Sequence, residues 1–574
     1  MKTLLMAGAA ASLLAGSGLS AHAQTENHRK RAPHRHPPSA SAEYRRALDS
    51  LTSEVQDLRG QVQTLQDHLN AQTAAQAQTQ AQAQQATALA QAAQQTAQTV
   101  KTEDAQAAAS AIQTIPAQVA SAVQAARTSS DAIYYKGLKI TLGGFLELAN
   151  QYRSRALGSD MFSPFATIPF NNVIPGHESE DRFSPRQSRL SALVQGNVDP
   201  GTQVAMYSEI DFLGAAQSAN YTESNSFTPR LRQLYATIDW PDSGWHLLAG
   251  QAWSLATLNS QGITPRNELP PPMIDAQFIP GFVWTRQPQV RVTKDFDKTI
   301  WLALSVESPQ TTFGGVVPAG VVDSIANSTG LYAGATGATA PPSAGGGTPV
   351  TPTAGVSSLN SVPDVIGKAA YEAKIYDREV HAEVFGLGRG FSERIGSSNQ
   401  TVYGGGVGVG LIAQLVPGLL DLQASALTGR GIGRYGTSQL PDVTFSPNGR
   451  IQPIGETDWL AGVTVHATKT LDIYAFGGEE QEQRQAYASN YGLGSSQLDL
   501  SGCYVEGGAC SAATNSVEQG TFGFWDRLYQ GSFGHVQVGV QYSYTERRAF
   551  SGLNGLTPVT DDNIVFGSLR YYPF

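Results

Sequence analysis

Very short turns alternate with long polar loops from about Gly137 to the C-terminal Phe574, and this alternation most constrains the fold of the chain. The short turns lie at seven places, residues 198–201, 241–244, 297–298, 376–377, 416–418, 468–469 and 532–534. Eight long connections lie at residues 153–187, 214–228, 255–287, 309–362, 391–399, 431–455, 483–520 and 548–561. Seven turns and eight loops join sixteen strands, with both ends on the short-turn side, as a closed outer-membrane barrel requires.

Apolar and polar residues alternate between the turns, and alternation on a pleated strand sorts side chains onto two faces. In one segment Ile300, Leu302, Leu304 and Val306 share one face, and Trp301, Ser305 and Glu307 share the other. A soluble β-sandwich also alternates and is the alternative, but its loops are rarely long on one side only. The sequence therefore predicts an all-β transmembrane barrel of 16 antiparallel strands over residues 132–574, preceded by an α-helical coiled-coil segment.

Composition agrees with a barrel and excludes other classes. The chain has 574 residues, of which 41 % are hydrophobic, and a mean hydropathy of -0.21. A membrane barrel needs only every second strand residue to be apolar, so this low value does not argue against a membrane. No run of about 18 apolar residues follows the first residues, so helical spans are not expected. The net charge of -9 gives no support for nucleic-acid binding, and we expect no such partner.

The N-terminus carries two segments of distinct composition. Residues 1–23 have a basic start, an apolar stretch and a small-x-small pattern at Ala21 and Ala23, which predicts a secretory signal peptide, with a soluble helix as the alternative. Residues 24–42 form a basic, Pro-rich tether, interpreted as a solvated arm, with contact to an anionic wall polymer or a metal as alternatives. Export of a chain with barrel strands predicts the outer membrane of a Gram-negative bacterium.

Residues 43–131 are expected to form a coiled coil followed by an Ala/Gln-rich helical linker. Apolar residues recur at alternating spacings of three and four at Leu48, Leu51, Val55, Leu58, Val62, Leu65 and Leu69. Such a narrow seam is typical of helices that supercoil with copies of themselves, whereas a helix lying on a membrane has a wider apolar face. Since the first strand begins on the short-turn side, this stalk should stand in the periplasm.

A barrel of sixteen strands is too wide for its own side chains to fill, so it encloses an aqueous channel. By strand parity, the basic residues offered to this channel are Lys139, Arg189, Arg291, Lys368, Lys374 and Arg570. The acidic ones are Glu147, Glu209, Asp211, Glu307, Glu383 and Asp421. Facing rows of opposite charge would select solutes by charge, while the alternative is that these residues pair on the wall and only solvate it.

Two of the long loops carry further expectations. The loop at residues 255–287 contains Arg266, Arg286, three consecutive prolines and several apolar residues, which suits a segment folded inward to narrow the channel. Cys503 and Cys510 are the only cysteines and share the loop at residues 483–520. In an oxidising compartment they are expected to form a disulfide, with two free thiols as the alternative.

Several strand segments resemble the DcaP-like porins, outer-membrane channels with an N-terminal periplasmic coiled coil. The matching pieces are Gly-Gly-Phe at 143–145, Arg-Gln-Ser-Arg-Leu at 186–190, Arg-Leu-Arg-Gln-Leu-Tyr-Ala at 230–236 and Leu-Ala-Gly-Gln-Ala-Trp-Ser at 248–254. The resemblance implies a homotrimer that passes small, mostly anionic solutes such as dicarboxylates, with Arg189, Arg230 and Arg232 as solute contacts. Arg230 and Arg232 share the strand parity of Leu234, so a bulge or a position above the lipid is required.

The sequence thus predicts a porin whose water-filled channel lets small hydrophilic, anionic solutes diffuse. The alternative is a structural tether between the outer membrane and peptidoglycan, with the barrel as its anchor. An enzyme embedded in a barrel needs a clustered nucleophile and base, but the histidines are scattered, so we expect no enzyme, no cofactor and no metal site. The expected partners are other copies of the chain, outer-membrane lipids and lipopolysaccharide, small solutes and, as a further candidate, peptidoglycan.

Overall fold

The computed structural model describes residues 132–214, 227–315, 360–395, 398–487 and 491–574, together with Gly60 and Gln63. The chain divides into two compact units, residues 1–126 and 127–574. In the first unit the described residues are Gly60 and Gln63, both helical. The expected signal peptide and tether, and almost all of the expected coiled coil, lie outside the described residues. No helix among the described residues is long and apolar enough to span a membrane.

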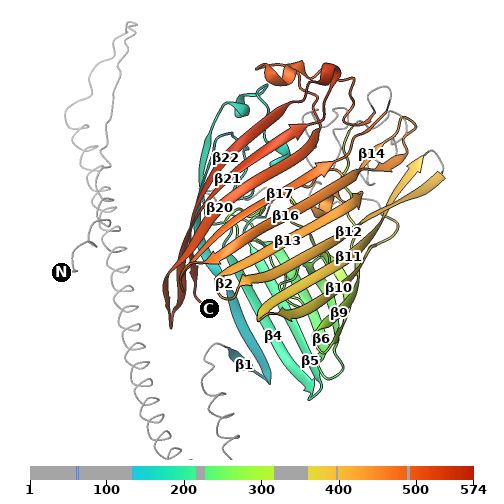
Figure 1. Ribbon diagram of the computed structural model, residues 1–574. Helices are drawn as coiled ribbons and strands as arrows, with labels where there is room; N and C mark the ends of the chain where they lie inside the picture. The colour runs from blue at the N-terminus through green and yellow to red at the C-terminus, as the bar shows by residue number, and fades with distance from the viewer. Residues whose placement is uncertain are drawn as a thin grey trace, which may run out of the picture. The chain divides into compact units, whose positions relative to one another are not determined.

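The second unit is a closed barrel of sixteen antiparallel strands, as the sequence predicts. The strands are β2 (Leu138–Arg153), β4 (Arg189–Asp199), β5 (Thr202–Asp211), β6 (Arg230–Trp240), β7 (Trp245–Trp253), β8 (Arg286–Phe296), β9 (Ile300–Glu307), β10 (Asp364–Ile375), β11 (Arg378–Ile395), β12 (Ser398–Val416), β13 (Leu420–Arg430), β16 (Gly455–His466), β17 (Leu471–Glu482), β20 (Thr514–Gly531), β21 (Gly534–Ala549) and β22 (Val559–Tyr572). Each strand pairs with the next, and the barrel closes where Leu146 of β2 lies opposite Tyr571 of β22. Figure 1 shows the strands side by side and tilted around the barrel.

Shorter elements lie before the barrel and within its long loops. β1 (Ile133–Tyr135) and β3 (Glu180–Ser184) both pair with β2. Two small hairpins are formed by β14 (Val443–Phe445) with β15 (Ile451–Pro453) and by β18 (Gln485–Ala486) with β19 (Gly492–Leu493). The short helices are η2 (Phe165–Thr167), η3 (Ile174–Gly176), η5 (Gly433–Tyr435), η7 (Ser501–Tyr504) and η8 (Leu553–Gly555).

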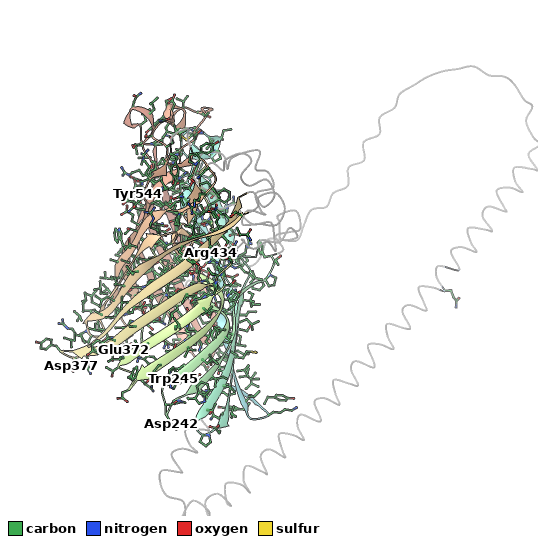
Figure 2. The ribbon with its side chains drawn as sticks, turned by 90° about the vertical axis from the view of Figure 1, so that its right-hand side faces the viewer. Asp242, Trp245, Glu372, Asp377, Arg434 and Tyr544 are labelled. Carbon is green, nitrogen blue, oxygen red and sulfur yellow. A yellow bond between two sulfur atoms is a disulfide. The ribbon has the colours of Figure 1, made fainter. Side chains whose placement is uncertain are left out.

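All seven short turns predicted from the sequence connect consecutive strands. Asp242 and Asp377, from two of these turns, lie at the same end of the barrel, whereas Arg434 and Tyr544 lie towards the other end (Figure 2). The prediction of a long loop at residues 391–399 is wrong, because β11 continues to Ile395 and β12 begins at Ser398. The pairing persists there because Phe391 is buried against the loop that follows β13.

The alternation of side chains follows the predicted parity. On β9, Leu302 and Leu304 are 47 % and 55 % exposed, whereas Ser305 and Glu307 are 0 % and 1 % exposed. The exposed row is the apolar face that a lipid-embedded barrel presents to the membrane. The buried row faces the lumen, where loops cover it.

The segment between β7 and β8, residues 254–285, folds into the lumen, and we call it the inward loop. Its backbone at Ile274 donates to Oε1 of Gln541 on β21 at 2.6 Å. Lys368 of β10, on another part of the wall, donates to the carbonyl of Thr257 in the inward loop at 2.7 Å. The apolar residues of the inward loop form one buried cluster with residues of the strands. From the loop it includes Met273, Ile274, Ile279 and Phe282, and from the strands Trp253, Tyr474, Phe476 and Trp525. The hydrophobic core of this unit therefore lies inside the barrel, around the inward loop.

Candidate solute-binding site

A β-bulge in β6 turns two arginines towards the lumen. Glu209 of β5 lies opposite Gln233, and the next residue, Ile210, lies opposite Leu231, so that Arg232 has no partner in the register. Arg232 and Gln233 are therefore both buried, at 4 % and 5 % exposed. A bulge inserts one extra residue and re-aims the side chains beyond it. The bulge required by the strand parity of Arg230 and Arg232 is therefore present.

Two carboxylates hold these arginines in place. Arg232 Nε lies 2.6 Å from Oε1 of Glu209, and its Nη1 lies 3.0 Å from Oδ2 of Asp211. Arg230 binds Asp211 with two parallel hydrogen bonds, of 2.9 and 2.7 Å. Asp211 is also fixed by the amide of Leu213 at 3.1 Å. Charge-assisted bonds of this kind fix both partners in a single geometry.

Two further arginines, Arg189 and Arg286, lie near the same carboxylates but form no hydrogen bond with them in the structure. Arg189 Nη1 lies 3.7 Å from Oε2 of Glu209, and its buried Nε has no hydrogen-bond partner among the described residues. Arg286 lies over the ring of Trp253 at 4.7 Å, and its buried Nη1 likewise has no partner in the part of the chain described. The charge of Arg286 interacts with those of Arg189, Arg230, Arg232 and Glu209. Four guanidinium groups thus share two carboxylates, which leaves an excess of two positive charges and spare N–H donors.

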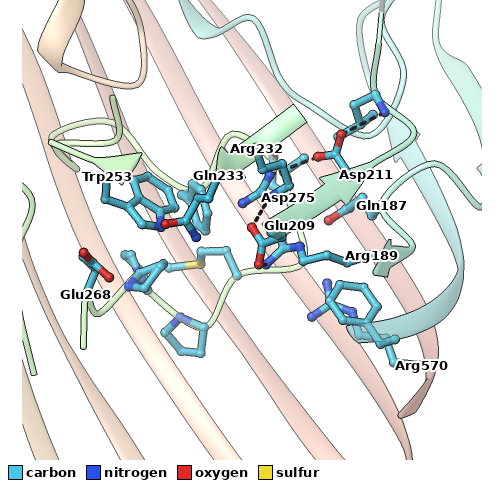
Figure 3. Close-up of a pocket in the computed structure, with 18 of the residues that line it drawn as sticks. Gln187, Arg189, Glu209, Asp211, Arg232, Gln233, Trp253, Glu268, Asp275 and Arg570 are labelled. Carbon is cyan, nitrogen blue, oxygen red and sulfur yellow. Dashed lines mark hydrogen bonds and ion pairs between the residues drawn. The ribbon is translucent and has the colours of Figure 1, made fainter. Parts of the chain in front are cut away.

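This cluster borders a cavity of about 450 Å³ in the lumen, shown in Figure 3. The wall supplies Phe145, Gln187, Arg189, Tyr207, Glu209, Asp211, Arg232, Trp253, Trp525 and Arg570, among others. The inward loop closes the other side with Arg266, Glu268 and residues 270–273. Arg570 is held by Glu147 at 3.0 Å and lies over the rings of Phe145 and Trp525. We call this space the arginine cavity.

A second cavity, of about 520 Å³, lies next to the first. The two share Leu213 and Ala276 in their lining. Its charged lining residues are Asp160, Arg186 and Arg230, and its other walls come from the first long loop and from residues 437–439. Arginines therefore line both compartments in succession.

Two carboxyl groups of the inward loop also line the arginine cavity. Burial raises the pKa of Glu268, although Arg291, with Nη1 4.0 Å from its Oε1, opposes this. Burial also raises the pKa of Asp275, which accepts hydrogen bonds from the amides of Ser163 and Gln277. The protonated forms of both are favoured relative to ordinary carboxyl groups, which reduces the negative charge that they contribute to the cavity.

The structure separates the predicted site residues into two groups. Arg189, Arg232, Arg266, Glu209 and Asp211 line the arginine cavity. Arg230 and Arg286 belong to the same charge cluster but do not line this cavity, and Arg230 lines the second one. Arg291 and Lys368 do not line this cavity; they are 2 % and 3 % exposed and lie beneath the inward loop. Arg291 donates to the carbonyl of Trp253 at 2.5 Å, and Lys368 pairs with Glu383 at 2.7 Å. Strand parity places both on the lumen face, but the inward loop covers them.

Lys139 lies away from the arginine cavity. It is exposed near the start of β2, six residues before Phe145. At about 3.3 Å per strand residue this separation is about 20 Å.

Both cysteines lie outside the cavities, in the loop between β17 and β20. The structure joins Cys503 and Cys510 in a disulfide, and Cys503 packs with Phe170, Leu500 and Ala549 in a small buried cluster. This cluster connects the disulfide loop to the first long loop.

The histidines of the strands have structural partners. His246, His381 and His466 each lie between two carboxylates, Asp239 and Asp295, Glu372 and Glu383, and Asp472 and Asp421, respectively. His535 stacks on Tyr572 with ring centroids 4.1 Å apart. Because both ring nitrogens of the first three are bonded to carboxylates, none of those three is arranged as the base of a nucleophilic dyad.

Comparison with known proteins identifies the fold. No protein-family model and no curated protein matches the chain. The crystal structure of the outer-membrane channel DcaP of Acinetobacter baumannii aligns with a TM-score of 0.53 and 19 % identity, over 77 % of this chain and 99 % of that one. The chain has the DcaP-type barrel fold. The resemblance expected from the sequence is confirmed at this level.

Two further solved structures align with the chain more weakly. An anion-selective porin from Comamonas acidovorans aligns with a TM-score of 0.40 and 10 % identity, over 76 % of this chain and 99 % of that one. OmpF of Salmonella typhi, in complex with daunomycin, aligns with a TM-score of 0.41 and 10 % identity, over 77 % and 99 %. At these scores the likenesses add nothing about the site.

Sequence reasoning missed some residues that line the cavities of this DcaP-type barrel. Arg186 bonds Asp160 at 2.9 Å and lies over the ring of Phe227, but it precedes β4, where strand parity cannot be counted. Trp525 and Tyr207 face the lumen by the parity of β20 and β5, and that signal was available. The parity of these two residues did not single them out, because aromatic residues are equally expected on the lipid face.

Proposed function

We propose that this chain is an outer-membrane porin whose channel passes small hydrophilic anions of the dicarboxylate type. The observation that carries the proposal is the arginine cluster at the cavity, with four guanidinium groups against two carboxylates. Guanidinium groups bind carboxylates through paired N–H donors. Arg189, which lines the cavity, and Arg286, in the same cluster, each retain a buried donor without a partner among the described residues. A solute carboxylate would satisfy them.

The size of the site suits a small solute. Small-molecule sites have volumes of roughly 300–1,000 Å³, and the arginine cavity, of about 450 Å³, lies at the lower end of this range. Aromatic rings of Phe145, Tyr207, Trp253 and Trp525 line the rest of it. A short carbon chain between two carboxylates would contact these rings, while each carboxylate meets an arginine.

The test is ion selectivity in planar bilayers. Purified, folded protein should give stepwise currents, and reversal potentials in asymmetric salt should favour anions. Replacement Arg189→Ala should shift the reversal potential towards cations, whereas Arg189→Lys, which keeps the charge, should shift it less. Removing one charge about 4 Å from the solute path in a water-like dielectric changes its energy by about 1 kcal/mol, about a fivefold change in relative permeability.

Lys139→Ala is the matched control. It removes the same charge from the same lumen wall, but about 20 Å from the cavity at the strand rise of about 3.3 Å per residue. It should leave the reversal potential nearly unchanged. Equal shifts for Arg189→Ala and Lys139→Ala would remove the arginine cluster from the proposal, and the absence of any stepwise current would defeat the porin itself.

We further propose that the chain assembles as a homotrimer in the outer membrane. The barrel would lie in the outer membrane of a Gram-negative bacterium, among lipids and lipopolysaccharide, with residues 43–131 in the periplasm as a coiled coil. The heptad seam from Leu48 to Leu69 supports self-association, and the resemblance to the DcaP-like porins supports a homotrimer. Mass measurement of the detergent-solubilised protein, with and without residues 43–131, tests this; a monomer in both forms would contradict it.

A further inference from the structure

Four carboxylates form two facing pairs on the lumen side of β16 and β17. Glu456 lies directly opposite Glu482, and Asp458 lies directly opposite Glu480. Both pairs point inward, since the residues between them, Thr457 and Gln481, are exposed. Like charges directly opposite each other destabilise a sheet, so this arrangement needs a compensating interaction.

All four carboxylates are buried. Glu456 and Glu482 are each 1 % exposed, and Asp458 and Glu480 are each 0 % exposed. Within the described residues, none of the four forms an ion pair with a Lys, Arg or His side chain. A buried charge is normally paired or bound to a metal, because its removal from water is otherwise strongly unfavourable.

Three of the carboxylates have acceptors that the protein leaves unused. Both oxygens of Glu456, Asp458 and Glu482 lack a hydrogen-bond donor among the described residues. The charge of Glu482, which comes from the end of β17, interacts with those of Asp442, Asp458 and Glu480. Six buried carboxylate oxygens of these three residues therefore have no donor among the described residues.

Glu480 differs, because loop backbones fix it. Its Oε1 accepts from the amide of Gly281 at 2.8 Å and from the hydroxyl of Thr437 at 3.1 Å. Its Oε2 accepts from the amide of Ser438 at 3.0 Å. Gly281 has φ +86°, and a side chain there would collide with the carbonyl of Trp459, so the loop can approach the wall only with glycine at this position.

The geometry suits a hard cation. One oxygen from each of Glu456, Asp458 and Glu480 can be chosen so that all three lie within 4.8 Å of one another. Calcium takes six to eight oxygen ligands at about 2.3–2.6 Å, so two oxygens on the same ion are at most about 5 Å apart. Carboxylate oxygens are the ligands that calcium prefers, and no softer donor is present in this group.

We propose that Glu456, Asp458 and Glu480, with Glu482 beside them, bind a calcium ion inside the barrel. The sequence analysis expected no metal site, and this proposal departs from it. Because Glu480 also carries the amides of Gly281 and Ser438, the ion would join the wall to the inward loop and to the loop after β13. The site would stabilise the loops that narrow the channel without touching the solute.

The experiment measures calcium binding to the full mature chain in detergent at pH 7.5, by isothermal titration with CaCl₂ after chelator treatment. Wild-type protein should bind one calcium ion, and chelation with EDTA should lower its thermal unfolding midpoint. The double variant Glu456→Gln/Asp458→Asn should lose the binding isotherm. Since it also removes the repulsion, its unfolding midpoint in EDTA should equal or exceed that of wild type, so the variant is expected to fold.

Glu479→Gln is the matched control, because Glu479 lies on the same strand but faces outward, where Trp459 donates to it at 3.1 Å. This variant should bind calcium as wild type does. Repetition with MgCl₂ should give weaker binding, since magnesium demands a smaller octahedral site.

Neutralisation by protons would give a different result from calcium binding. The alternative is that protons, and not a metal ion, neutralise Glu456 and Asp458. In that case wild type and the double variant would both show no calcium isotherm, and EDTA would leave the unfolding midpoint of each unchanged. That pair of observations would overturn the proposal.

Discussion

Trp525 of β20 donates its indole N–H to the carbonyl of Pro272 at the middle of the inward loop, with an N···O distance of 2.9 Å. In the order of strands around the barrel, β20 lies eight strands from β8, which is half of the circumference. The inward loop leaves the wall at β7 and β8 and is thus bonded to the wall directly opposite. This bond fixes the width of the arginine cavity, which both residues line.

Replacement Trp525→Phe should loosen the inward loop. The ring over Arg570 remains, but the hydrogen bond, with a net contribution of about 1 kcal/mol, is lost. We expect larger single-channel conductance and more current noise in planar bilayers. Trp284→Phe is the control, because the indole nitrogen of Trp284 has no partner among the described residues. Identical conductance for both variants would show that the bond does not restrain the loop.

Arg389 should be essential for the stability of the barrel. Its side chain is fully buried, pairs with Asp364 at 3.1 Å and Asp442 at 2.5 Å, and donates to the carbonyl of Gly431. Removal of one partner from a buried ion pair destabilises by about 3–5 kcal/mol, because the other charges stay buried. Arg389→Met should therefore unfold at clearly lower urea concentration in detergent micelles, as followed by tryptophan fluorescence.

Arg548→Met is the control for this prediction. Arg548 pairs with Glu546 at 2.5 Å, but its side chain is 47 % exposed. Exposed pairs contribute about 0–1 kcal/mol. Its urea midpoint should lie close to that of wild type, and equal losses for both variants would contradict the assignment of Arg389 as a buried clamp.

The disulfide should stabilise its loop but not the channel. It joins cysteines seven residues apart, for which loop-closure entropy gives about 2 kcal/mol. The double variant Cys503→Ser/Cys510→Ser should be cut faster by chymotrypsin after Tyr504, which is 48 % exposed within the loop. Cleavage after Tyr376, which is 93 % exposed in a short turn, is the internal standard and should not change. Altered conductance would contradict a purely local role.

Turn spacing and parity carried the prediction of the fold because both are local properties of the chain. A turn such as residues 376–377 needs residues that tolerate positive φ, and Tyr376 and Asp377 have φ of +48° and +61°. Parity did not predict where the hairpin of β11 and β12 ends. Beyond Phe391 the strands continue because another loop packs on them, which no pattern within β11 records.

The positions of the candidate site residues were predicted only in part, for a similar reason. Parity correctly placed Arg189, Arg291 and Lys368 on the lumen face, but it contains no information about the inward loop that covers the last two. The bulge at Arg232 depends on the register between β5 and β6. The sequence of β6 alone indicated that a bulge or a position above the lipid was needed, but not which of the two occurs. The facing carboxylates of β16 and β17 also depend on register, which sets Glu456 against Glu482.

Anion selectivity should rise as the pH falls, because of Glu268. Burial raises the pKa of this carboxyl above its ordinary value of 4.5, against the opposing charges of Arg291 and Lys368. Above the raised pKa the carboxylate is charged and offsets part of the positive charge of the arginine cluster, and below it the group is neutral. Because burial disfavours the charged form of Glu268, its contribution to folding stability is fully present below pH 4.5 and is lost as the pH rises through the raised pKa.

Reversal potentials in asymmetric salt should therefore move towards the anion limit as the pH is lowered from 7, with a midpoint above 4.5. Glu268→Gln should be more anion-selective than wild type at pH 7 and should lose the part of this dependence that Glu268 carries, leaving that of Asp275, whose pKa burial also raises. Glu178→Gln, at an exposed position of the first long loop, removes the same charge away from the cavity and should titrate as wild type does. A midpoint below 4.5 in wild type would mean that Arg291 and Lys368 outweigh burial, and Glu268 would then be a permanent counter-charge of the arginine cavity.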